Sequence, residues 1–263
     1  MKIAILCGGK GTRLQERTES IPKPLIEIGG MPILWHIMKI YSHYGFNDFV
    51  LLLGYKGHKI KEYFVEGDSW RRHDFTLTTG GGRDPNVRIE CHHRDAEDWR
   101  ITFVDTGLET NTGGRIKKAQ RYMDDDDTFM VTYGDGVADI DLDALLQTHR
   151  QHGRLATVTA VTPLNQFGIM RVDEVGAVRA FVEKPRMTDW VNGGFFVFEH
   201  DVFKYLEEDS VLEREPLERL AQDGQIVAYK HTGFWNCMDT YKDAVALDTL
   251  WNSRQARWKL WDD

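Results

Sequence analysis

Apolar and polar positions in the N-terminal part of the chain predict strands and helices in regular alternation. Residues 3–7 (IAILC) form a continuous apolar run, which is typical of a strand buried on both faces. Residues 32–44 carry apolar side chains at helical spacing, and this predicted helix ends at Gly45. A second buried strand over 48–53 and a second helix over 56–64 repeat the order. The succession predicts a parallel sheet with right-handed crossovers.

The pattern changes along the rest of the chain. Residues 67–82 show little patterning and include three consecutive glycines, so we expect a mobile loop there. The remaining predicted strands are 86–92, 101–105, 128–133, 156–161, 169–172, 178–183 and 191–198, and the remaining helices are 112–122, 141–152 and 240–258. From residue 156 the strands follow one another with little helix between them. This predicts an antiparallel or mixed lobe over the second half of an α/β sheet.

Composition narrows the class of protein. The chain has 263 residues, 41% hydrophobic and 28% charged, which suits a soluble globular protein with one large domain or two small ones. The formal net charge of −8 argues against nucleic acid or an anionic membrane as the main partner. A positive binding site for an anionic substrate must therefore be local.

Cysteine usage and hydropathy indicate a compartment. Cys7, Cys91 and Cys237 are widely spaced and form no C-x-x-C motif, so they predict neither a disulfide framework nor a zinc site. The N-terminal apolar run is too short for a signal peptide, and no stretch reaches transmembrane length. We expect a reducing, cytoplasmic location.

A glycine-rich segment directly follows the first predicted strand. Its bare amides and polar side chains could hold phosphate, and they belong to Gly8, Gly9, Gly11, Thr12 and Arg13. Lys23 stands between two prolines about ten residues later. Amides without side chains approach an anion closely, and fixed cations neutralise it. The segment therefore predicts a phosphate-binding loop.

Two common phosphate loops do not fit this segment. A dinucleotide fingerprint needs a third glycine at the position of Leu14. A P-loop needs Ser or Thr after its lysine, but Lys10 is followed by Gly11. The pattern that remains is G-G-x-G-T-R-L followed by P-K-P.

Two carboxylates are candidates for a metal site. Asp135 follows the predicted strand 128–133, at the end where open α/β sheets bind ligands. It lies between glycines, so a simple turn is an equal alternative. Asp239 in FWNCMDT could instead be the N-cap of the last helix. Facing one phosphate loop together, the two would suit Mg²⁺.

Four further motifs combine glycine or proline with polar side chains. Glu183-Lys184-Pro185 closes a strand, with an exposed edge pair as the plain alternative. Asn192 precedes two glycines inside an apolar run, which indicates a bulge or a close approach to a ligand. Gly168 lies in a possible turn, and Gly113 and Arg115 open a predicted helix whose amides could meet a base or a phosphate. By contrast, the acidic run 124–127 is typical of a solvated turn, and a core position is the better interpretation of His149.

Taken in order, GGKGTRL, PKP, TYGDG, VEKP, VNGGFFVF and FWNCMDT resemble the sugar-1-phosphate nucleotidyltransferase family over nearly the whole chain. The segments TYGDGVAD and NGGFFV, with FWNCMDT, are similar to its cytidylyltransferase branch. The resemblance implies CTP and α-D-glucose 1-phosphate as substrates, CDP-glucose and pyrophosphate as products, and a route to CDP-deoxysugars of surface polysaccharide. It also implies a Rossmann-like, glycosyltransferase-A-like sheet.

The resemblance implies roles for individual residues. Arg13 would bind the leaving pyrophosphate, Lys23 would neutralise charge at the α-phosphorus, and Asp135 and Asp239 would hold Mg²⁺. The nucleotide would lie near Gly8, Gly9, Gly11, Thr12, Gly113, Arg115 and Asp135, and the sugar phosphate near Gly168, Glu183, Lys184 and Asn192. One domain over 1–263 would contain a nucleotide-binding half (1–140), a sugar-phosphate-binding half (141–240) and a C-terminal helix and tail (241–263).

Other functions stay open at this point. The chain could use another nucleotide or sugar 1-phosphate, or bind nucleotide sugars as a regulator without turnover. A nicotinamide-dependent oxidoreductase is disfavoured by Leu14. The tail tryptophans Trp251, Trp258 and Trp261, together with the resemblance, suggest a homo-oligomer, although a packed core would explain them equally well.

Overall fold

β1 (Lys2–Cys7) lies inside a seven-stranded sheet and has neighbours on both edges. The structure, a computed structural model, describes residues 1–11, 20–65, 74–78, 88–91, 97–165 and 167–262. Ile3 and Ile5 pack into a core cluster on one face of the sheet, while Ala4 and Leu6 pack into a second cluster on the other face. Successive strand side chains point to opposite faces, so the expected burial of this strand on both faces is confirmed.

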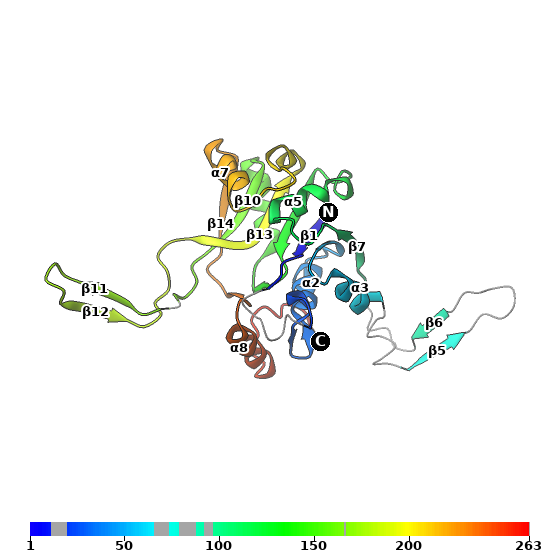
Figure 1. Ribbon diagram of the computed structural model, residues 1–263, viewed down its shortest axis with the longest axis horizontal. Coiled ribbons are helices and arrows are strands. Elements are labelled where there is room, and N and C mark those ends of the chain that lie inside the picture. The colour runs from blue at the N-terminus through cyan, green and yellow to red at the C-terminus, as the bar shows by residue number, and fades with distance from the viewer. Residues whose placement is uncertain (12–19, 66–73, 79–87, 92–96, 166, 263) are drawn as a thin grey trace.

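The sheet strands lie in the order β14-β10-β13-β8-β1-β4-β7 (Figure 1). The bounds of the other six are β4 (Asp48–Leu53), β7 (Arg100–Asp105), β8 (Thr128–Tyr133), β10 (Ala156–Val161), β13 (Val191–Glu199) and β14 (Ile226–Lys230). β8, β1, β4 and β7 are parallel neighbours, and so are β10 and β14. β13 runs antiparallel to both β8 and β10. The predicted mostly parallel α/β sheet is confirmed.

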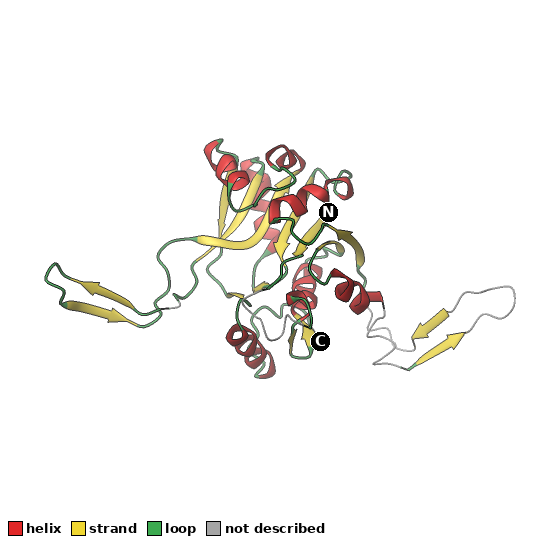
Figure 2. Ribbon diagram, viewed as in Figure 1, coloured by secondary structure: helices red, strands yellow, loops and turns green. Residues whose placement is uncertain are grey.

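Helices cover both faces of the sheet (Figure 2). The α-helices are α2 (Ile33–His43), α3 (Gly57–Val65), α5 (Thr112–Lys118), α6 (Leu142–His152), α7 (Glu215–Gln222) and α8 (Tyr241–Asn252), and the 3-10 turns are η2 (Lys23–Leu25), η3 (Gln120–Tyr122) and η4 (His200–Tyr205). Side chains of α2, α6 and α8 join the core cluster of Ile3, whereas those of α5 and α7 join the cluster of Ala4. Each face of the sheet therefore has its own helical cover.

Two predicted helices are shorter than expected. The last helix ends at Asn252 and not at residue 258, because Arg254 takes a left-handed φ of 59° that stops the helix. The predicted helix 112–122 is interrupted after Lys118, and a 3-10 turn follows it. His149 of α6 is buried, as its position on the apolar face indicates.

Two hairpins extend from the sheet on opposite sides of the view (Figure 1). β11 (Ile169–Val172) pairs with β12 (Val178–Val182), and every residue of both strands is exposed. β5 (Phe75–Thr78) pairs with β6 (Arg88–Cys91). The expectation of a loop is therefore wrong for residues 75–78, where the β-favouring sequence FTLT forms a strand once it has a partner.

Two short antiparallel pairs lie beside the sheet. β2 (Glu27–Ile28) pairs with β3 (Met31–Pro32), and β9 (Gly136–Ala138) pairs with β15 (Trp235–Cys237). Among helices in the described parts of the chain, none has the length and apolar character needed to cross a bilayer.

The aromatic tail packs onto the chain's own core. Trp258 is fully buried, and Trp251 and Trp261 pack against the same core cluster. They surround buried His36, whose Nε2 lies 2.8 Å from the carbonyl oxygen of Ile28 and whose Nδ1 faces the indole N–H of Trp258 at 3.4 Å. Core packing therefore accounts for these tryptophans, and they are no sign of an interface.

Candidate active site

The ends of β1 and β8 place two of the predicted motifs side by side. β1 and β8 are parallel neighbours with Leu6 opposite Tyr133. The amide of Gly134 donates to the carbonyl oxygen of Leu6 at 3.1 Å. Gly8 and Asp135 therefore emerge at the same edge of the sheet, where open α/β sheets bind their ligands.

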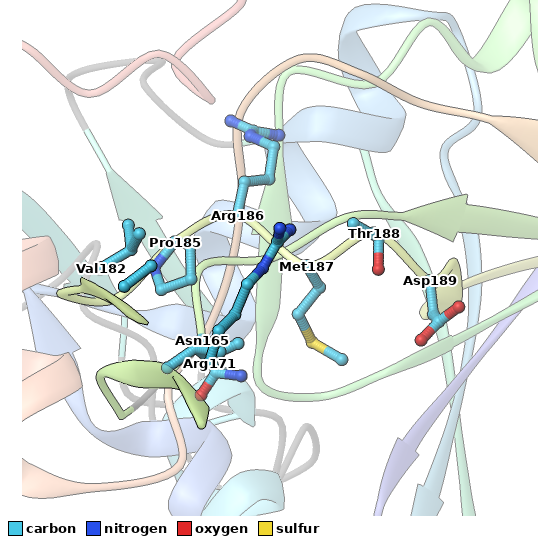
Figure 3. Close-up of a pocket in the computed structure, with 10 residues that line it drawn as sticks. Asn165, Arg171, Val182, Pro185, Arg186, Met187, Thr188 and Asp189 are labelled. Atoms are coloured by element: carbon cyan, nitrogen blue, oxygen red, sulfur yellow. The ribbon is translucent and has the colours of Figure 1, made fainter. Parts of the chain in front are cut away.

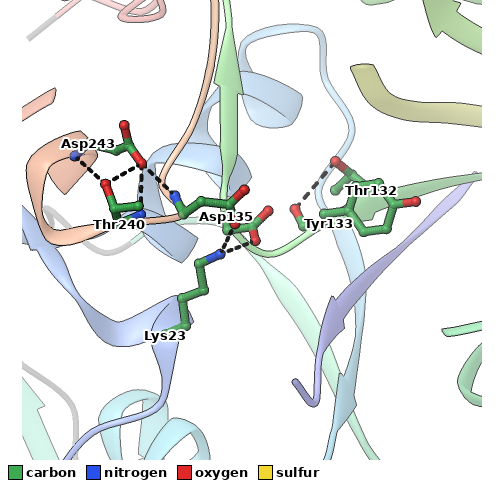
Figure 4. A network of polar contacts seen from close by, with 7 residues as sticks. Lys23, Thr132, Tyr133, Asp135, Thr240 and Asp243 are labelled. Atoms are coloured by element: carbon green, nitrogen blue, oxygen red, sulfur yellow. Dashed lines mark hydrogen bonds and ion pairs between the residues drawn. The ribbon is translucent and has the colours of Figure 1, made fainter. Parts of the chain in front are cut away.

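Lys23 lies between two carboxylates at this edge. It sits in η2, between Pro22 and Pro24, and its side chain is only 12% exposed. Its Nζ atom lies 2.6 Å from Oδ2 of Asp135 and 2.9 Å from Oδ1 of Asp239 (Figure 4). We call these three residues the Lys23 cluster. It joins positions separated by 112 and 216 residues in the chain.

The pairing of β9 with β15 brings Asp239 to Asp135. Cys237 lies opposite Gly136 in this pair, and the amide of Met238 donates to the carbonyl oxygen of Asp135 at 2.9 Å. The N-cap of α8 is Thr240, which forms a capping box with Asp243. The capping alternative for Asp239 is therefore excluded, because its carboxylate pairs with Lys23 while its neighbour caps the helix.

The protonation of Lys23 depends on the two carboxylates. Burial lowers the pKa of Lys23, but the charge of Asp135 and the hydrogen bonds to Asp135 and Asp239 outweigh it and leave the pKa above its ordinary value. The ammonium therefore stays charged at neutral pH. Two acidic groups hold one cation here, which is the electrostatic arrangement that a metal ion would also satisfy.

The donor set at this edge fits a divalent cation. Ligand atoms of Asp135, Cys237 and Asp239 lie within 4.8 Å of one another. Burial, and then Asp135 and Asp239, raise the pKa of the Cys237 thiol, so it stays protonated. Carboxylate oxygens are the ligands that Mg²⁺ prefers, and thiols are not. Among the residues that the structure describes, the carboxylates of Asp135 and Asp239 therefore fit a divalent metal ion.

Arg115 holds the backbone of the glycine loop in place through hydrogen bonds. Its buried guanidinium donates to the carbonyl oxygens of Gly8 (3.1 Å), Leu53 (3.1 Å), Gly107 (2.7 Å) and Leu108 (3.2 Å). It also donates to the hydroxyl of Thr106 at 2.6 Å. These acceptors follow the ends of β1, β4 and β7. Arg115 therefore lies beside the predicted nucleotide loop, but its donors serve the protein backbone.

The glycines of the two predicted nucleotide segments differ in their surroundings. A Cβ atom on Gly8 would collide with the Arg115 guanidinium, whereas no atom of the described residues lies within 4 Å of a Cβ on Gly9. Gly11 has a left-handed φ of 61°. Gly113 packs against Ser210, so its lack of a side chain serves helix packing. Thr12 and Arg13 lie outside the described residues.

Asn192 lies next to the same edge of the sheet. Its Nδ2 donates to the hydroxyl of Tyr133 at 3.2 Å, and its Oδ1 accepts from the amide of Gly194 at 2.8 Å. Gly194 has a φ of 80°, and a Cβ there would touch the ring of Tyr133. The two glycines that follow Asn192 thus permit two close approaches, Gly193 to Thr159 and Val161 of β10 and Gly194 to the Tyr133 ring.

Glu183, Lys184 and Gly168 lie together at the base of the β11–β12 hairpin. A Cβ on Gly168 would come within 2.9 Å of the Glu183 carboxylate. Lys184 has a left-handed φ of 44°, and its Nζ lies 3.7 Å from Oε1 of Glu183 with both side chains exposed. The next residue, Pro185, begins the wall of a pocket that includes Arg171 and Arg186 (Figure 3). These three residues therefore form a group separate from the Lys23 cluster.

Three residues near the site were missed by sequence reasoning. Cys237 stands two positions before Asp239 in an extended segment, and this spacing places both on one side of the chain, so a signal was present. Tyr133 directly precedes the Gly134-Asp135 motif. Glu213, which accepts from Tyr133 and Thr112, carries no local signal because its partners lie 80 and 101 residues away.

Comparison with known proteins identifies the family. A model of the nucleotidyl transferase family matches residues 2–243. The chain therefore belongs to the nucleotidyl transferase family of enzymes.

The relatives extend over the whole chain. A probable glucose-1-phosphate cytidylyltransferase of Bacillus subtilis is 48% identical over 99% of this chain and 100% of its own length. The glucose-1-phosphate cytidylyltransferase of Salmonella typhi is 47% identical over all of both chains. The resemblance to this branch of the family is thus confirmed.

Solved structures support the fold. HddC from Yersinia pseudotuberculosis has a TM-score of 0.69 at 21% identity, and it covers 95% of this chain and 99% of its own. An apo UDP-glucose pyrophosphorylase also has a TM-score of 0.69, at 13% identity, over 97% of this chain and 99% of its own. The predicted fold class is confirmed.

Proposed function

We propose that this enzyme joins CTP to α-D-glucose 1-phosphate, forming CDP-glucose and pyrophosphate. The relatives at 47–48% identity over the full length support this pair of substrates. The observation that carries the proposal is the Lys23 cluster, because it collects one cation and two carboxylates beside the glycine loop. The alternative function, a regulator that binds nucleotide sugars without turnover, does not account for this arrangement of charges.

The reaction is an in-line displacement at the α-phosphorus of CTP. An oxygen of the glucose 1-phosphate phosphate forms the new P–O bond, and the bond to the β-phosphate oxygen breaks to release pyrophosphate. A phosphate monoester has its second pKa near 6, so the attacking oxygen already carries charge at neutral pH. No general base is required. The protein has to position two polyanions and stabilise the charge that develops.

Lys23 is the residue we assign to the α-phosphate. Lys23 lies in a turn between two prolines at the edge of the sheet. Because its backbone is already restricted, little conformational entropy is lost when substrate binds. Asp135 and Asp239 would hold Mg²⁺, which, when bound, neutralises charge on the triphosphate. With these carboxylates so engaged, the Lys23 ammonium is free to donate to phosphate oxygens. Arg13 is assigned to pyrophosphate by resemblance alone.

The loop and the sugar pocket complete the proposal. Arg115 positions the Gly8 backbone, so that the amides of Gly8, Gly9 and Gly11 with Thr12 and Gly113 would surround the nucleotide. Lys184 would bind the sugar phosphate, and Glu183, Asn192 and the Gly168 backbone would contact the sugar. The free, protonated thiols of buried Cys7 and of Cys237 suit the reducing cytoplasm, where we place the enzyme.

We further propose that the enzyme works as a homo-oligomer. Val178, Phe181 and Val182 of the β11–β12 hairpin are 54–60% exposed, and Ile169 and Met170 of the paired strand are also exposed. An apolar arm of this kind is typical of a protein interface. Sedimentation should show a multimer that a Phe181→Asp substitution dissociates. A monomeric wild-type protein would exclude this state.

The substrates are tested by a panel of four nucleoside triphosphates against several sugar 1-phosphates, read by pyrophosphate release with Mg²⁺. We expect CTP with glucose 1-phosphate to give the highest kcat/KM. Higher turnover with another pair would change the assigned substrates but keep the reaction. Absence of pyrophosphate release with every pair would overturn the enzyme proposal.

A further inference from the structure

A series of hydrogen bonds links the end of β8 to the start of α5 through Glu213. One carboxylate oxygen of Glu213 accepts from the hydroxyl of Tyr133 at 2.5 Å, and the other accepts from the hydroxyl of Thr112 at 2.6 Å. The amide of Leu212 donates to the same Thr112 hydroxyl at 2.9 Å. Tyr133 ends β8 next to the Gly134-Asp135 motif, and Thr112 begins α5. Glu213 thus joins two elements that line the proposed site.

The donor and the acceptor of each of these hydrogen bonds can be assigned. The amide of Gly194 can only donate, so the atom of Asn192 that faces it must be the carbonyl oxygen Oδ1. Nδ2 of Asn192 therefore faces Tyr133, and the tyrosine hydroxyl accepts from it. That hydroxyl donates its own proton to the Glu213 carboxylate.

This arrangement leaves Asn192 with one polar group to offer. Oδ1 and one Nδ2 hydrogen are engaged within the protein, and the second Nδ2 hydrogen has no acceptor among the residues that the structure describes. Asn192 is exposed next to the edge of the sheet. A substrate group that contacts it has to accept a hydrogen bond.

We propose that Glu213 and Tyr133 are positioning residues that hold the Asn192 side chain so that its second Nδ2 hydrogen donates to one hydroxyl oxygen of the sugar. The inference rests on the proposed function, since it assigns Asn192 to the sugar 1-phosphate. Glu213 and Tyr133 do not touch substrate in this scheme. The Gly194 amide fixes which end of the Asn192 amide is the nitrogen, and the Tyr133 hydroxyl engages one Nδ2 hydrogen and so holds the other in place for the sugar.

The first test removes the hydrogen bonds made by Tyr133 and Glu213 but keeps Asn192. In Tyr133→Phe we expect KM for glucose 1-phosphate to rise about tenfold, the effect of losing roughly one oriented hydrogen bond, with KM for CTP within about twofold of wild type. Glu213→Ala should act in the same way, and Tyr133→Phe with Glu213→Ala should be no worse than Tyr133→Phe alone. Tyr44→Phe is the matched control, because the Tyr44 hydroxyl donates to the carbonyl oxygen of Ile140 outside the cleft.

The second test reads the direction of the Asn192 hydrogen bond. Glucose 1-phosphates in which one hydroxyl is replaced by hydrogen or by fluorine are compared at each ring position. Hydrogen can neither donate nor accept, whereas fluorine keeps a weak acceptor. At the position facing Asn192 the fluoro analogue should be the better substrate. The difference should become smaller in Tyr133→Phe, because the Asn192 side chain then keeps only its contact with the Gly194 amide.

The outcomes separate the two proposals. If the wild type forms CDP-glucose while Tyr133→Phe and Glu213→Ala keep wild-type KM for glucose 1-phosphate, this inference is overturned and the proposed function stands. Equal changes in both KM values, or additive effects in the double variant, would reduce the two residues to a general structural role. A wild type that turns over no sugar 1-phosphate overturns both proposals together.

Discussion

The guanidinium of Arg115 occupies the space that a side chain on Gly8 would need. It donates to the Gly8 carbonyl oxygen at 3.1 Å, and a Cβ atom on Gly8 would overlap its Cζ and Nη1 atoms. The glycine loop therefore rests on a buried charge that also contacts the ends of two neighbouring strands. This contact explains why the first glycine is required even without a ligand.

The contact predicts a stability difference between adjacent glycines. Gly8→Ala should lower the free energy of unfolding by about 1–3 kcal/mol, since the added methyl displaces a packed guanidinium. Gly9→Ala is the matched control, because its Cβ position has no neighbour within 4 Å in the described part of the chain, and it should change stability by less than about 0.5 kcal/mol. Urea unfolding followed by tryptophan fluorescence measures both, and equal effects would contradict this account of the loop.

Loss of the Lys23 ammonium should remove charge stabilisation in the transition state. We expect Lys23→Ala to lower kcat by about 10²–10³, as loss of one oriented cationic donor does elsewhere. Lys39→Ala is the control: Lys39 is also largely buried and pairs with Glu97 at 3.0 Å, but away from the sheet edge. Pyrophosphate release measures both variants, and near-normal turnover of Lys23→Ala would refute the role of Lys23.

The carboxylates of the Lys23 cluster should set the metal requirement. Asp239→Asn keeps the shape of the side chain but removes one charge, so we expect the Mg²⁺ concentration for half-maximal activity to rise about tenfold or more. Asp125→Asn provides a control from the acidic run 124–127, since the Asp125 side chain is 97% exposed. Activity is titrated against Mg²⁺ after removal of metal with a chelator. Unchanged half-saturation in Asp239→Asn would exclude this carboxylate as a ligand.

Buried His36 should make stability depend on pH. Burial lowers the pKa of His36 from 6.5 to about 4 and outweighs the hydrogen bonds to the backbone of Ile28 and Met31, which raise it. Between these pH values the unfolded state binds more protons than the folded state, so stability is lost as pH falls from 6.5 toward 4. The loss should reach about 3 kcal/mol at the acidic end.

Urea unfolding between pH 4.5 and 7.5 tests this expectation. The slope of unfolding free energy against pH should be clearly smaller in His36→Gln than in the wild type, whatever the absolute stability of the variant. Identical slopes would show that other groups cause the acid sensitivity.

Local sequence patterns were sufficient to predict the sheet strands before residue 200 and the edge at which the motifs meet. The run at 3–7 indicates a two-sided strand because every position in it is apolar, and Asp135 follows from the strand that precedes it. Other features depend on partners distant in the chain. Whether Asp239 caps α8 or pairs with Lys23 is decided by the capping box of Thr240 and by the β9–β15 pairing. The five backbone and hydroxyl acceptors of Arg115 lie at the ends of separate strands, so its contacts with them cannot be predicted from its neighbours in sequence.

The antiparallel insertion of β13 between β8 and β10 has a consequence for dividing the protein. Phe198 of β13 lies opposite Phe129 of β8, and both side chains are fully buried. A cut near residue 140 would leave β8 as a bare edge and expose those rings to water. Fragments 1–140 and 141–263 should therefore be insoluble when expressed apart, and catalysis should return only by complementation, when the second fragment restores its strand to the first.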